Sequence, residues 1–204
     1  MKKIILVFSL YFLGFVIPQA VSQNRFDASL FGGLNVCQVD GDDAGRYNHL
    51  GFRAGVGTSF PLSDDIHSPW RMIVELAYIQ KGSHINSANG EINLQYVELP
   101  LLLAYSALED HLRLAVGVAP AVKVGCSVTF GGVNDANQES LYRTFDWLPL
   151  TLSAEYLFTD HLGITARWEN SLLSVYDGSG PYRFFRSNHG AFNRLLSFGL
   201  TYRL

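Results

Sequence analysis

The sequence predicts an all-β chain that crosses a membrane as an antiparallel, up-and-down β-barrel of about eight strands with a polar, plugged lumen. Three observations support this fold class. Apolar residues alternate with polar or small residues along about eight segments. The charged residues of those segments share the parity opposite to the apolar one. The chain is 48% hydrophobic but only 16% charged, whereas a soluble domain carries about 25% charged residues, and this deficit is typical of a surface that contacts lipid.

The N-terminal segment predicts export from the cytoplasm. Residues 1–22 are expected to be a signal peptide and residues 23–204 the barrel domain. Two lysines precede the apolar stretch Ile4–Ile17, which is shorter than the roughly 20 residues of a membrane-spanning helix. Ala20 and Ser22 form a small-x-small cleavage site. An N-terminal membrane anchor is the alternative, and the short apolar stretch with polar residues after it disfavours that interpretation.

The alternating segments are expected to be the strands of the barrel, with apolar side chains facing lipid and the other parity facing the lumen. They cover residues 26–36, 50–60, 70–81, 92–105, 112–128, 148–158, 162–168 and 196–204. Connections after the odd strands tend to be long and polar, and those after the even strands are mostly short. Outer-membrane barrels have long extracellular loops and short periplasmic turns, so the pattern predicts the outer membrane. Segment 61–69 fits least well, because it is long for a periplasmic turn.

The segment 92–105 shows a change of phase in its alternation. A β-bulge at Tyr96–Val97 would keep the apolar residues before and after it on one face. Glu98 would then face the lumen, and Pro100 would lie where the hydrogen-bond ladder is already broken. The residues assigned to the lipid face in this way are Ile92, Leu94, Tyr96, Val97, Leu99, Leu101, Leu103 and Tyr105.

The charged residues of the strands are expected to form an ion-pair network in the lumen. A soluble barrel would carry its charges outside, and charges that face lipid are costly. Glu98 is expected at the centre, with Arg71 and Arg113 on neighbouring strands and Arg53 one strand further. The predicted network consists of Arg53, Arg71, Glu75, Glu98, Arg113, Lys123, Glu155, Arg167, Glu169 and Arg203, with Asp27 on the same parity.

Aromatic residues near the strand ends predict girdles at the membrane interfaces. They are Trp70, Tyr78, Tyr96, Tyr105, Tyr156, Trp168 and Tyr202. The alternative is that they are ordinary core aromatics.

The two cysteines are expected to be free thiols. Cys37 lies on the lumen parity of the first strand, and Cys126 lies on the lipid parity of the fifth strand. A disulfide needs Cα atoms within about 7 Å, so this placement argues against a bridge.

Two short motifs resemble those of the PorT-like outer-membrane β-barrel family of Gram-negative bacteria. They are ELAYIQKG, with Glu75, Tyr78, Lys81 and Gly82, and YVELPLLLAY, with Tyr96, Val97, Glu98 and Pro100. The opening FGGLN and the closing LSFGLTYRL also fit this resemblance. It covers the whole mature chain and implies a small membrane barrel. The founding member is linked to type IX protein secretion, but most members have no assigned activity, so the resemblance does not carry that role to this chain.

The sequence favours a non-enzymatic barrel with a structural role or a role in binding through its extracellular loops. It contains no G-x-S-x-G, C-x-x-C, H-E-x-x-H or phosphate-loop motif, so no cofactor or metal is expected. The net charge of −3 does not point to nucleic acid. The expected partners are outer-membrane lipid, the assembly machinery that reads the last strand, and an unknown extracellular or protein partner.

The long loops supply the expected binding surface. Aromatic and arginine side chains are favoured at such surfaces, and those of the last loop are Tyr176, Tyr182, Arg183, Phe184, Phe185 and Arg186. The alternative for this surface is a barrel rim that packs on itself.

Two further functions stay open. One is a lipid-modifying outer-membrane enzyme, for which the local His–Ser candidates are His84 with Ser83 or Ser87, and His189 with Ser187. The other is a narrow pore or a secretion-associated barrel. An eight-stranded lumen is just wide enough to be filled by side chains, which disfavours a pore.

Overall fold

The computed structural model describes residues 26–40, 47–63, 68–85, 90–176 and 191–204, and the expected signal peptide lies outside them. Its strands are β1 (Asp27–Asp40), β2 (His49–Pro61), β3 (Trp70–Ile85), β4 (Gly90–Glu98), β5 (Leu101–Ala107), β6 (Leu112–Val118), β7 (Ala121–Phe130), β8 (Val133–Asn134), β9 (Phe145–Asp146), β10 (Pro149–Leu157), β11 (Leu162–Ser171) and β12 (Phe192–Arg203). One short helix, α2 (Ala136–Ser140), follows β8. No helix in the described ranges is long and apolar enough to cross a membrane.

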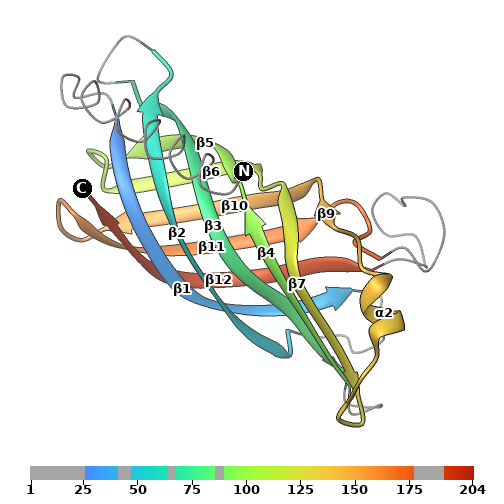
Figure 1. The fold of residues 1–204 in the computed structure, drawn as a ribbon. Coiled ribbons are helices and arrows are strands. Elements are labelled where there is room, and N and C mark those ends of the chain that lie inside the picture. The colour runs from blue at the N-terminus through green and yellow to red at the C-terminus, as the bar shows by residue number, and fades with distance from the viewer. Residues whose placement is uncertain (1–25, 41–46, 64–67, 86–89, 177–190) are drawn as a thin grey trace, which may run out of the picture.

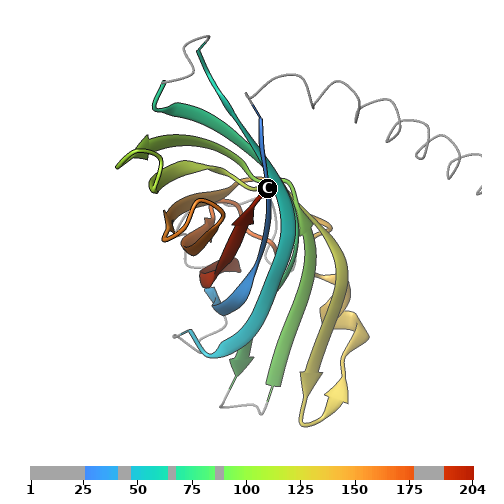
Figure 2. The same ribbon diagram turned by 90° about the vertical axis from the view of Figure 1, so that its left-hand side faces the viewer.

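The strands close into an eight-stranded antiparallel barrel, which confirms the predicted fold class. β1 pairs with β2 and with β12, β2 also pairs with β3, and β11 pairs with β10 and β12. β4 with β5, β6 with β7, and β9 with β10 each form one barrel strand with an interruption. Figures 1 and 2 show the strands curving around a common interior.

Prolines mark these interruptions in three neighbouring barrel strands. The carbonyl oxygens of Pro100, Pro120 and Pro149 accept hydrogen bonds from the backbone N–H groups of the adjacent strand, at 3.0, 2.9 and 3.0 Å. Proline cannot donate a ladder hydrogen bond, so the pairing stops for a few residues and then resumes on the same barrel strand.

The described ends of the chain lie at one end of the barrel, which we call the terminal end. The Leu204 N–H donates to the Ala28 carbonyl at 2.9 Å, and the Arg203 N–H donates to His161 in the β10–β11 turn at 2.7 Å. The opposite end, which we call the loop end, carries β8 and α2.

The predicted parity holds over most strands. In β2, for example, Leu50 is 66% exposed on the outer face, whereas Arg53 is 5% exposed inside. The same alternation of exposed apolar and buried polar residues continues through β6, β11 and β12. These strands bury charge and expose leucine, valine and phenylalanine, as a lipid-facing wall requires.

The prediction for Ile92, Leu94 and Tyr96 was wrong. These residues are 3%, 0% and 0% exposed and point into the barrel together with Glu98, so β4 keeps one phase. The shift of register lies in the partner strand, because Gln95 pairs with Gly125 while Tyr96 pairs with Lys123.

Val124 is therefore the extra residue, and the bulge predicted at Tyr96–Val97 belongs to β7. Beyond the bulge, the parity of β7 reverses, so Cys126 pairs with the inward Leu94 and Val128 pairs with the inward Ile92. The prediction that Cys126 faces lipid was consequently also wrong.

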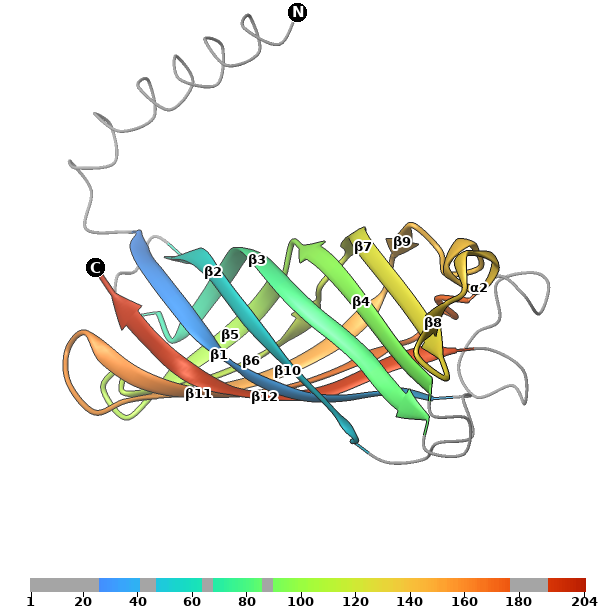
Figure 3. The same ribbon diagram turned by 60° about the horizontal axis from the view of Figure 1, so that its bottom comes forward.

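The loop-end parts of β3, β4 and β7 have a polar outer face, and the inner face of β4 and β7 there is apolar. On the outer face, Gln80 of β3 pairs with Gln95 of β4. Gly82 of β3 pairs with Asn93 of β4, which also pairs with Ser127 of β7. Figure 3 shows these three strands running side by side toward β8 and α2. This is the pattern of a sheet in water, so the lipid-facing band ends below these rows.

Candidate functional site

The middle of the lumen holds a buried ion-pair network, which we call the central cluster. Its members come from β2, β3, β4 and β11 and are Arg53, Glu75, Lys81, Glu98, Arg167 and Glu169. All are 8% exposed or less. Buried charges persist only when they are paired and hydrogen-bonded, so the positions of these six side chains depend on one another.

Lys81 is the partner of Glu98. The Lys81 Nζ lies 2.6 Å from Glu98 Oε1 and 3.5 Å from Glu169 Oε2. Both Lys81 and Glu98 are almost completely buried, at 1% and 0% exposure.

The expectation that Arg71 and Arg113 surround Glu98 was wrong, because the barrel places them in a separate cluster at the terminal end. Lys81 shares the parity of Glu75 in the motif ELAYIQKG, which places it in the lumen, but Arg71 shares that parity too, so the choice between them depends on the register of β3 against β4.

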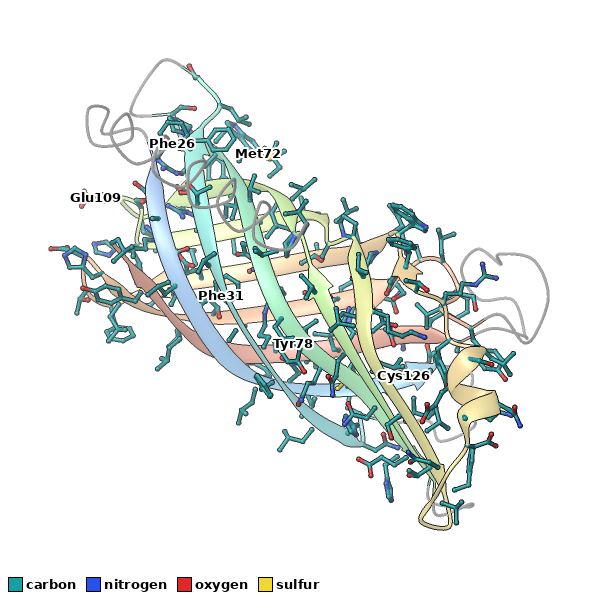
Figure 4. All side chains as sticks on the ribbon, in the orientation of Figure 1. Phe26, Phe31, Met72, Tyr78, Glu109 and Cys126 are labelled. Carbon is teal, nitrogen blue, oxygen red and sulfur yellow. The ribbon has the colours of Figure 1, made fainter. Side chains whose placement is uncertain are left out.

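The other half of the central cluster is built around Glu75. Arg167 donates to both carboxylate oxygens of Glu75 at 2.7 and 2.8 Å, which is the strong two-pronged geometry of an arginine–carboxylate pair. Arg53 lies 3.4 Å from Glu75 and 3.5 Å from Glu169. The Phe31 ring, labelled in Figure 4, lies under the Arg53 guanidinium at 5.0 Å from its centroid.

A glycine makes room for this arrangement. A Cβ atom on Gly55 would lie 2.7 Å from the Phe31 ring and 2.3 Å from the Leu76 carbonyl oxygen. Any side chain at this position would displace the ring that supports Arg53.

A second network, the rim cluster, lies at the terminal end. It consists of Asp27, Arg71, Asp110, Arg113, Glu155 and Arg203. Arg71 bonds Asp27 at 2.6 Å, and Asp110 accepts from Arg113 at 3.1 Å and from Arg203 at 2.9 Å. Arg203 also bonds Glu155. The predicted network is therefore two networks at different depths.

The space between the two clusters is small. A cavity of about 30 Å³ is lined by polar side chains of both clusters, among them Arg53, Glu75, Arg113 and Glu155. A water molecule needs about 10–15 Å³ of such space, so this cavity holds about two waters.

The loop-end part of the lumen is apolar, which the sequence interpretation missed. We call this group the outer cap; its main residues are Cys37, Val39, Ile79, Ile92, Leu94, Tyr96, Val128, Tyr142, Val175 and Leu195. Segments far apart in the chain meet there, since Tyr142 forms a β-bridge with Tyr176. The unbroken phase of β4, which puts Ile92, Leu94 and Tyr96 on the parity of Glu98, was the sequence signal that could have revealed this apolar inner face.

Lys123 takes part in the cap instead of the ion-pair network. Its Nζ donates to the Tyr142 carbonyl oxygen. Tyr176 belongs to the cap as well, because its ring meets Tyr142 edge to face at 5.2 Å and its hydroxyl donates to Gln138 at 2.9 Å. Tyr176 thus packs against the outer cap at the loop end. The other predicted loop residues, 182–186, lie outside the described residues.

Both cysteines are free thiols in the structure. The Cys37 Sγ donates to the His49 carbonyl at 3.4 Å, and Cys126, labelled in Figure 4, packs against the outer cap.

The His–Ser candidate that the structure describes does not form a catalytic pair. Ser83 is buried on the inner face and donates to Asn48 at 3.2 Å. His84 follows it in the strand, so its side chain points to the opposite face. Ser87, Ser187 and His189 lie outside the described residues. Among the described residues, no three His, Cys, Asp or Glu side chains cluster in a way that could hold a metal ion.

Comparison with known proteins gives matches among outer-membrane barrels. Three similar solved structures are Ail, the attachment invasion locus protein of Yersinia pestis, in complex with the heparin analogue sucrose octasulfate; Neisserial surface protein A; and OprG from Pseudomonas aeruginosa. Their identities are 12%, 11% and 12%, with TM-scores of 0.49, 0.44 and 0.44. The matches cover 88% of this chain in each case and 99%, 97% and 96% of the other chains. No curated protein sequence matches the chain significantly.

A family model described as the outer membrane protein beta-barrel domain matches residues 19–177. The match covers β1 to β11 and the following residues up to 177, which is most of the barrel. It agrees with the lipid-facing wall and the buried charges described above. The chain belongs to the outer membrane protein β-barrel domain family and is a small barrel of the outer membrane.

Proposed function

We propose that this barrel is a non-catalytic scaffold with a sealed lumen that presents its extracellular loops to a partner. The observation that carries the proposal is the double closure of the lumen. The central cluster and the outer cap block it at two depths, and the cavity below the central cluster has room for about two waters. A solute could pass only if buried ion pairs such as Lys81–Glu98 broke, which is costly.

The loop end is the binding end in this proposal. Outer-membrane barrels have short turns on the periplasmic side and longer loops outside, so the terminal end is periplasmic and the loop end extracellular. The polar outer faces of β3, β4 and β7 extend from the membrane on that side, and β8 and α2 continue them. The partner is an extracellular molecule or another membrane protein.

We further propose that residues 1–22 are a cleaved signal peptide, that residues 23–204 are the mature barrel domain, and that the assembly machinery recognises the last strand. Within the barrel family, we place the chain near the PorT-like branch. Support for this placement comes from the two motifs, which pair as β3 and β4 and bring Lys81 to Glu98.

Loop replacement in living cells tests the binding role. Residues 177–190 would be replaced by a short glycine–serine linker, and a photo-crosslinking residue would be placed at Ser127 and at Val133, which is 70% exposed. We expect crosslinked surface partners in the wild type and their loss in the loop variant, with the barrel still heat-modifiable on gels. A control variant with a replaced 159–161 turn should keep the crosslinks. Equal crosslinking in both variants would contradict a loop-mediated role.

Lipid analysis tests the remaining enzyme hypothesis. The phospholipids and the lipid A of cells with and without the protein would be compared by mass spectrometry, together with a His189→Ala variant. We expect no difference. A modified lipid that disappears in the variant would show that the protein is an enzyme.

A further inference from the structure

One buried carboxyl group of the lumen belongs to neither ion-pair cluster. Asp146 lies on β9, labelled in Figure 1, and is 1% exposed. It pairs with Ala121, and Ala121 pairs with Glu98 on its other side, so Asp146 lies level with the central cluster. The Ser171 hydroxyl and the Asn193 amide nitrogen both donate to Asp146 Oδ2, the latter at 3.3 Å. Asp146 Oδ1 has no hydrogen-bond partner.

The charges of the central cluster already balance without Asp146. The cluster contains three cations and three carboxylates. Lys81 is the cation that attracts Asp146 most strongly, but its Nζ lies 2.6 Å from Glu98 and 3.5 Å from Glu169. No ion pair among the described residues involves Asp146. A fourth negative charge would have no counter-charge, and a buried carboxyl group in that situation becomes neutral by keeping its proton.

The other titratable groups around Asp146 do not supply the missing positive charge. The Lys123 Nζ donates to the Tyr142 carbonyl oxygen in the outer cap. Tyr96 and Cys126, which pack in or against that cap, carry no charge at neutral pH. The charged and titratable residues on the strands packed around Asp146 are Arg53 on β2, Glu75 and Lys81 on β3, Tyr96 and Glu98 on β4, Lys123 and Cys126 on β7, and Arg167 and Glu169 on β11.

The contact with Asn193 fits a protonated carboxyl group. Asn193 is 2% exposed, and its Oδ1 atom, like Asp146 Oδ1, is buried without a partner. Both orphaned atoms are acceptors, so they cannot bond each other while Asp146 is ionised. A proton on Asp146 Oδ1 makes that atom a donor, and the free acceptor belongs to the same amide that already donates to Oδ2. The acid and the amide would then form two parallel hydrogen bonds, which removes both unsatisfied oxygens.

We propose that Asp146 is a buried proton-binding site whose neutral carboxyl group joins the central cluster to the outer cap. The site connects four barrel strands. Asp146 accepts from Ser171 of β11 and from Asn193 of β12, and Asn193 also donates to the hydroxyl of Tyr96 of β4 at 3.5 Å. The Lys81 Nζ lies 5.4 Å from the centroid of the Tyr96 ring. Loss of the proton in alkaline medium would leave an unpaired charge at this junction and weaken it.

Urea unfolding of the refolded barrel at a series of pH values tests the proposal. The unfolded chain releases the Asp146 proton above a pH of about 3.9, whereas the folded barrel keeps it. The folded state thus binds one more proton, and its stability falls as the pH rises until the folded barrel releases the proton as well. One such proton raises the unfolding equilibrium constant about tenfold per pH unit.

Asp146→Asn isolates this contribution, because an amide resembles the neutral acid and has no proton to lose in this range. The ratio of the wild-type unfolding constant to that of Asp146→Asn should rise about tenfold per pH unit above a pH of about 5. Asp110→Asn is the control, since Asp110 is an ion-paired carboxylate of the rim cluster. Its ratio to the wild type should not change near neutral pH. Heat-modifiable migration on gels confirms that each variant is folded.

Infrared spectroscopy detects the proton directly. In a detergent without ester groups, the folded wild type at neutral pH should show the C=O stretching band of a protonated carboxylic acid. Asp110→Asn should keep this band, and Asp146→Asn should lose it. The wild-type band is measured without any substitution, so this test does not depend on the folding of a variant.

Four outcomes would overturn the proposal. The first three are the absence of the band from the wild type, its retention in Asp146→Asn, and a ratio of the wild-type and Asp146→Asn unfolding constants that does not change with pH. The fourth is a wild-type unfolding constant that changes when sodium is replaced by a large organic cation at constant pH, with no such change in Asp146→Asn. That result would show that a metal cation occupies the site in place of the proton.

Discussion

Glu98 is the residue at which the buried ion-pair network is most simply tested. It is fully buried and bonds Lys81 at 2.6 Å. Glu98→Ala leaves that ammonium group without its nearest carboxylate, and breaking a buried pair costs about 3–5 kcal/mol. Glu98→Gln should cost less, because the amide oxygen still accepts a hydrogen bond. Urea unfolding of the refolded barrel in detergent measures both changes in the free energy of unfolding.

Glu91 provides the control for this comparison. Its side chain is 53% exposed and lies 3.8 Å from His49. Surface ion pairs contribute about 0–1 kcal/mol, so Glu91→Ala should be close to the wild type. If Glu98→Ala were equally stable, Glu98 would not be a buried member of the network.

The turn between β5 and β6 contains backbone strain at three consecutive residues. Leu108, Glu109 and Asp110 have φ angles of 51°, 56° and 68°, which costs non-glycine residues roughly 1–2 kcal/mol each. Leu108 is 65% exposed, so Leu108→Gly removes strain and little packing. We expect this variant to stabilise the barrel by up to about 1 kcal/mol in urea unfolding.

Leu62→Gly is the matched control for Leu108→Gly. Leu62 is an exposed leucine of the β2–β3 connection, and its φ angle is not positive. Leu62→Gly should therefore be neutral or destabilising. A loss of stability in Leu108→Gly as large as that in Leu62→Gly would show that the turn is unstrained.

Asp110 makes stability depend on pH. Burial raises the pKa of its carboxyl, but the charges of Arg113 and Arg203 and hydrogen bonds from Ser106 and Arg113 outweigh burial and hold the pKa below its ordinary value. A depressed pKa stabilises the fold above the unfolded value of about 3.9. That contribution disappears as the pH falls through the folded pKa.

The variant Asp110→Asn isolates this effect. The difference in unfolding free energy between the wild type and Asp110→Asn should be constant near neutral pH and should shrink toward zero in acid. Unfolding curves at a series of pH values measure it. If the difference in unfolding free energy grew as the pH falls, the pKa of Asp110 would be raised on folding, which would contradict a carboxylate stabilised by Arg113 and Arg203.

At the scale of the element, the bulge in β7 decides which residues fill the outer cap. Because Val124 is inserted, Cys126 points inward and packs against the cap. A thiol-reactive maleimide should therefore label Cys126 slowly in the folded barrel and quickly after denaturation.

Ser127 gives the control for the bulge. Its pairing with Asn93 places it on the polar outer face, so Ser127→Cys in a chain without the other cysteines should react quickly in the native state. Fast labelling of Cys126 in the folded barrel would contradict its inward position and would support the lipid-facing position that the sequence predicted.

The sequence predicts the inner and outer faces of the strands where only one of them is apolar. In β2 and β11, arginine and glutamate alternate with leucine, isoleucine and aromatics, so the inner face is unambiguous. In β4 and β7 both parities contain apolar residues, and the alternation does not show which of two paired strands carries an extra residue. The inward position of Cys126 depends on that single insertion, whereas that of Leu94 follows from the unbroken phase of β4.

Which charged side chains meet in the lumen depends on the register between neighbouring strands, and the sequence alone does not show that register. Arg71 and Lys81 share one parity of β3, but they are ten residues apart and lie in different clusters. The parity of Glu98 was predictable from its apolar neighbours. Its partner was not, because the choice between Arg71 and Lys81 requires the register of β3 against β4.

At the scale of the whole molecule, the barrel combines two kinds of core. Polar clusters fill the part of the lumen within the membrane, where the outside is apolar. An apolar cap fills the part whose wall has a polar outer face. This reversal of the inner and outer faces along one sheet gives a closed barrel that needs no water-filled channel.

The most direct test of this account is the conductance of the purified barrel in planar lipid bilayers. With the central cluster and the outer cap intact, we predict no stable single-channel steps at any applied voltage that the bilayer tolerates. A double variant that removes both Lys81 and Glu98 should also stay closed, because the outer cap and the Glu75–Arg167 pair remain. Reproducible conductance of the wild-type barrel would contradict a sealed lumen.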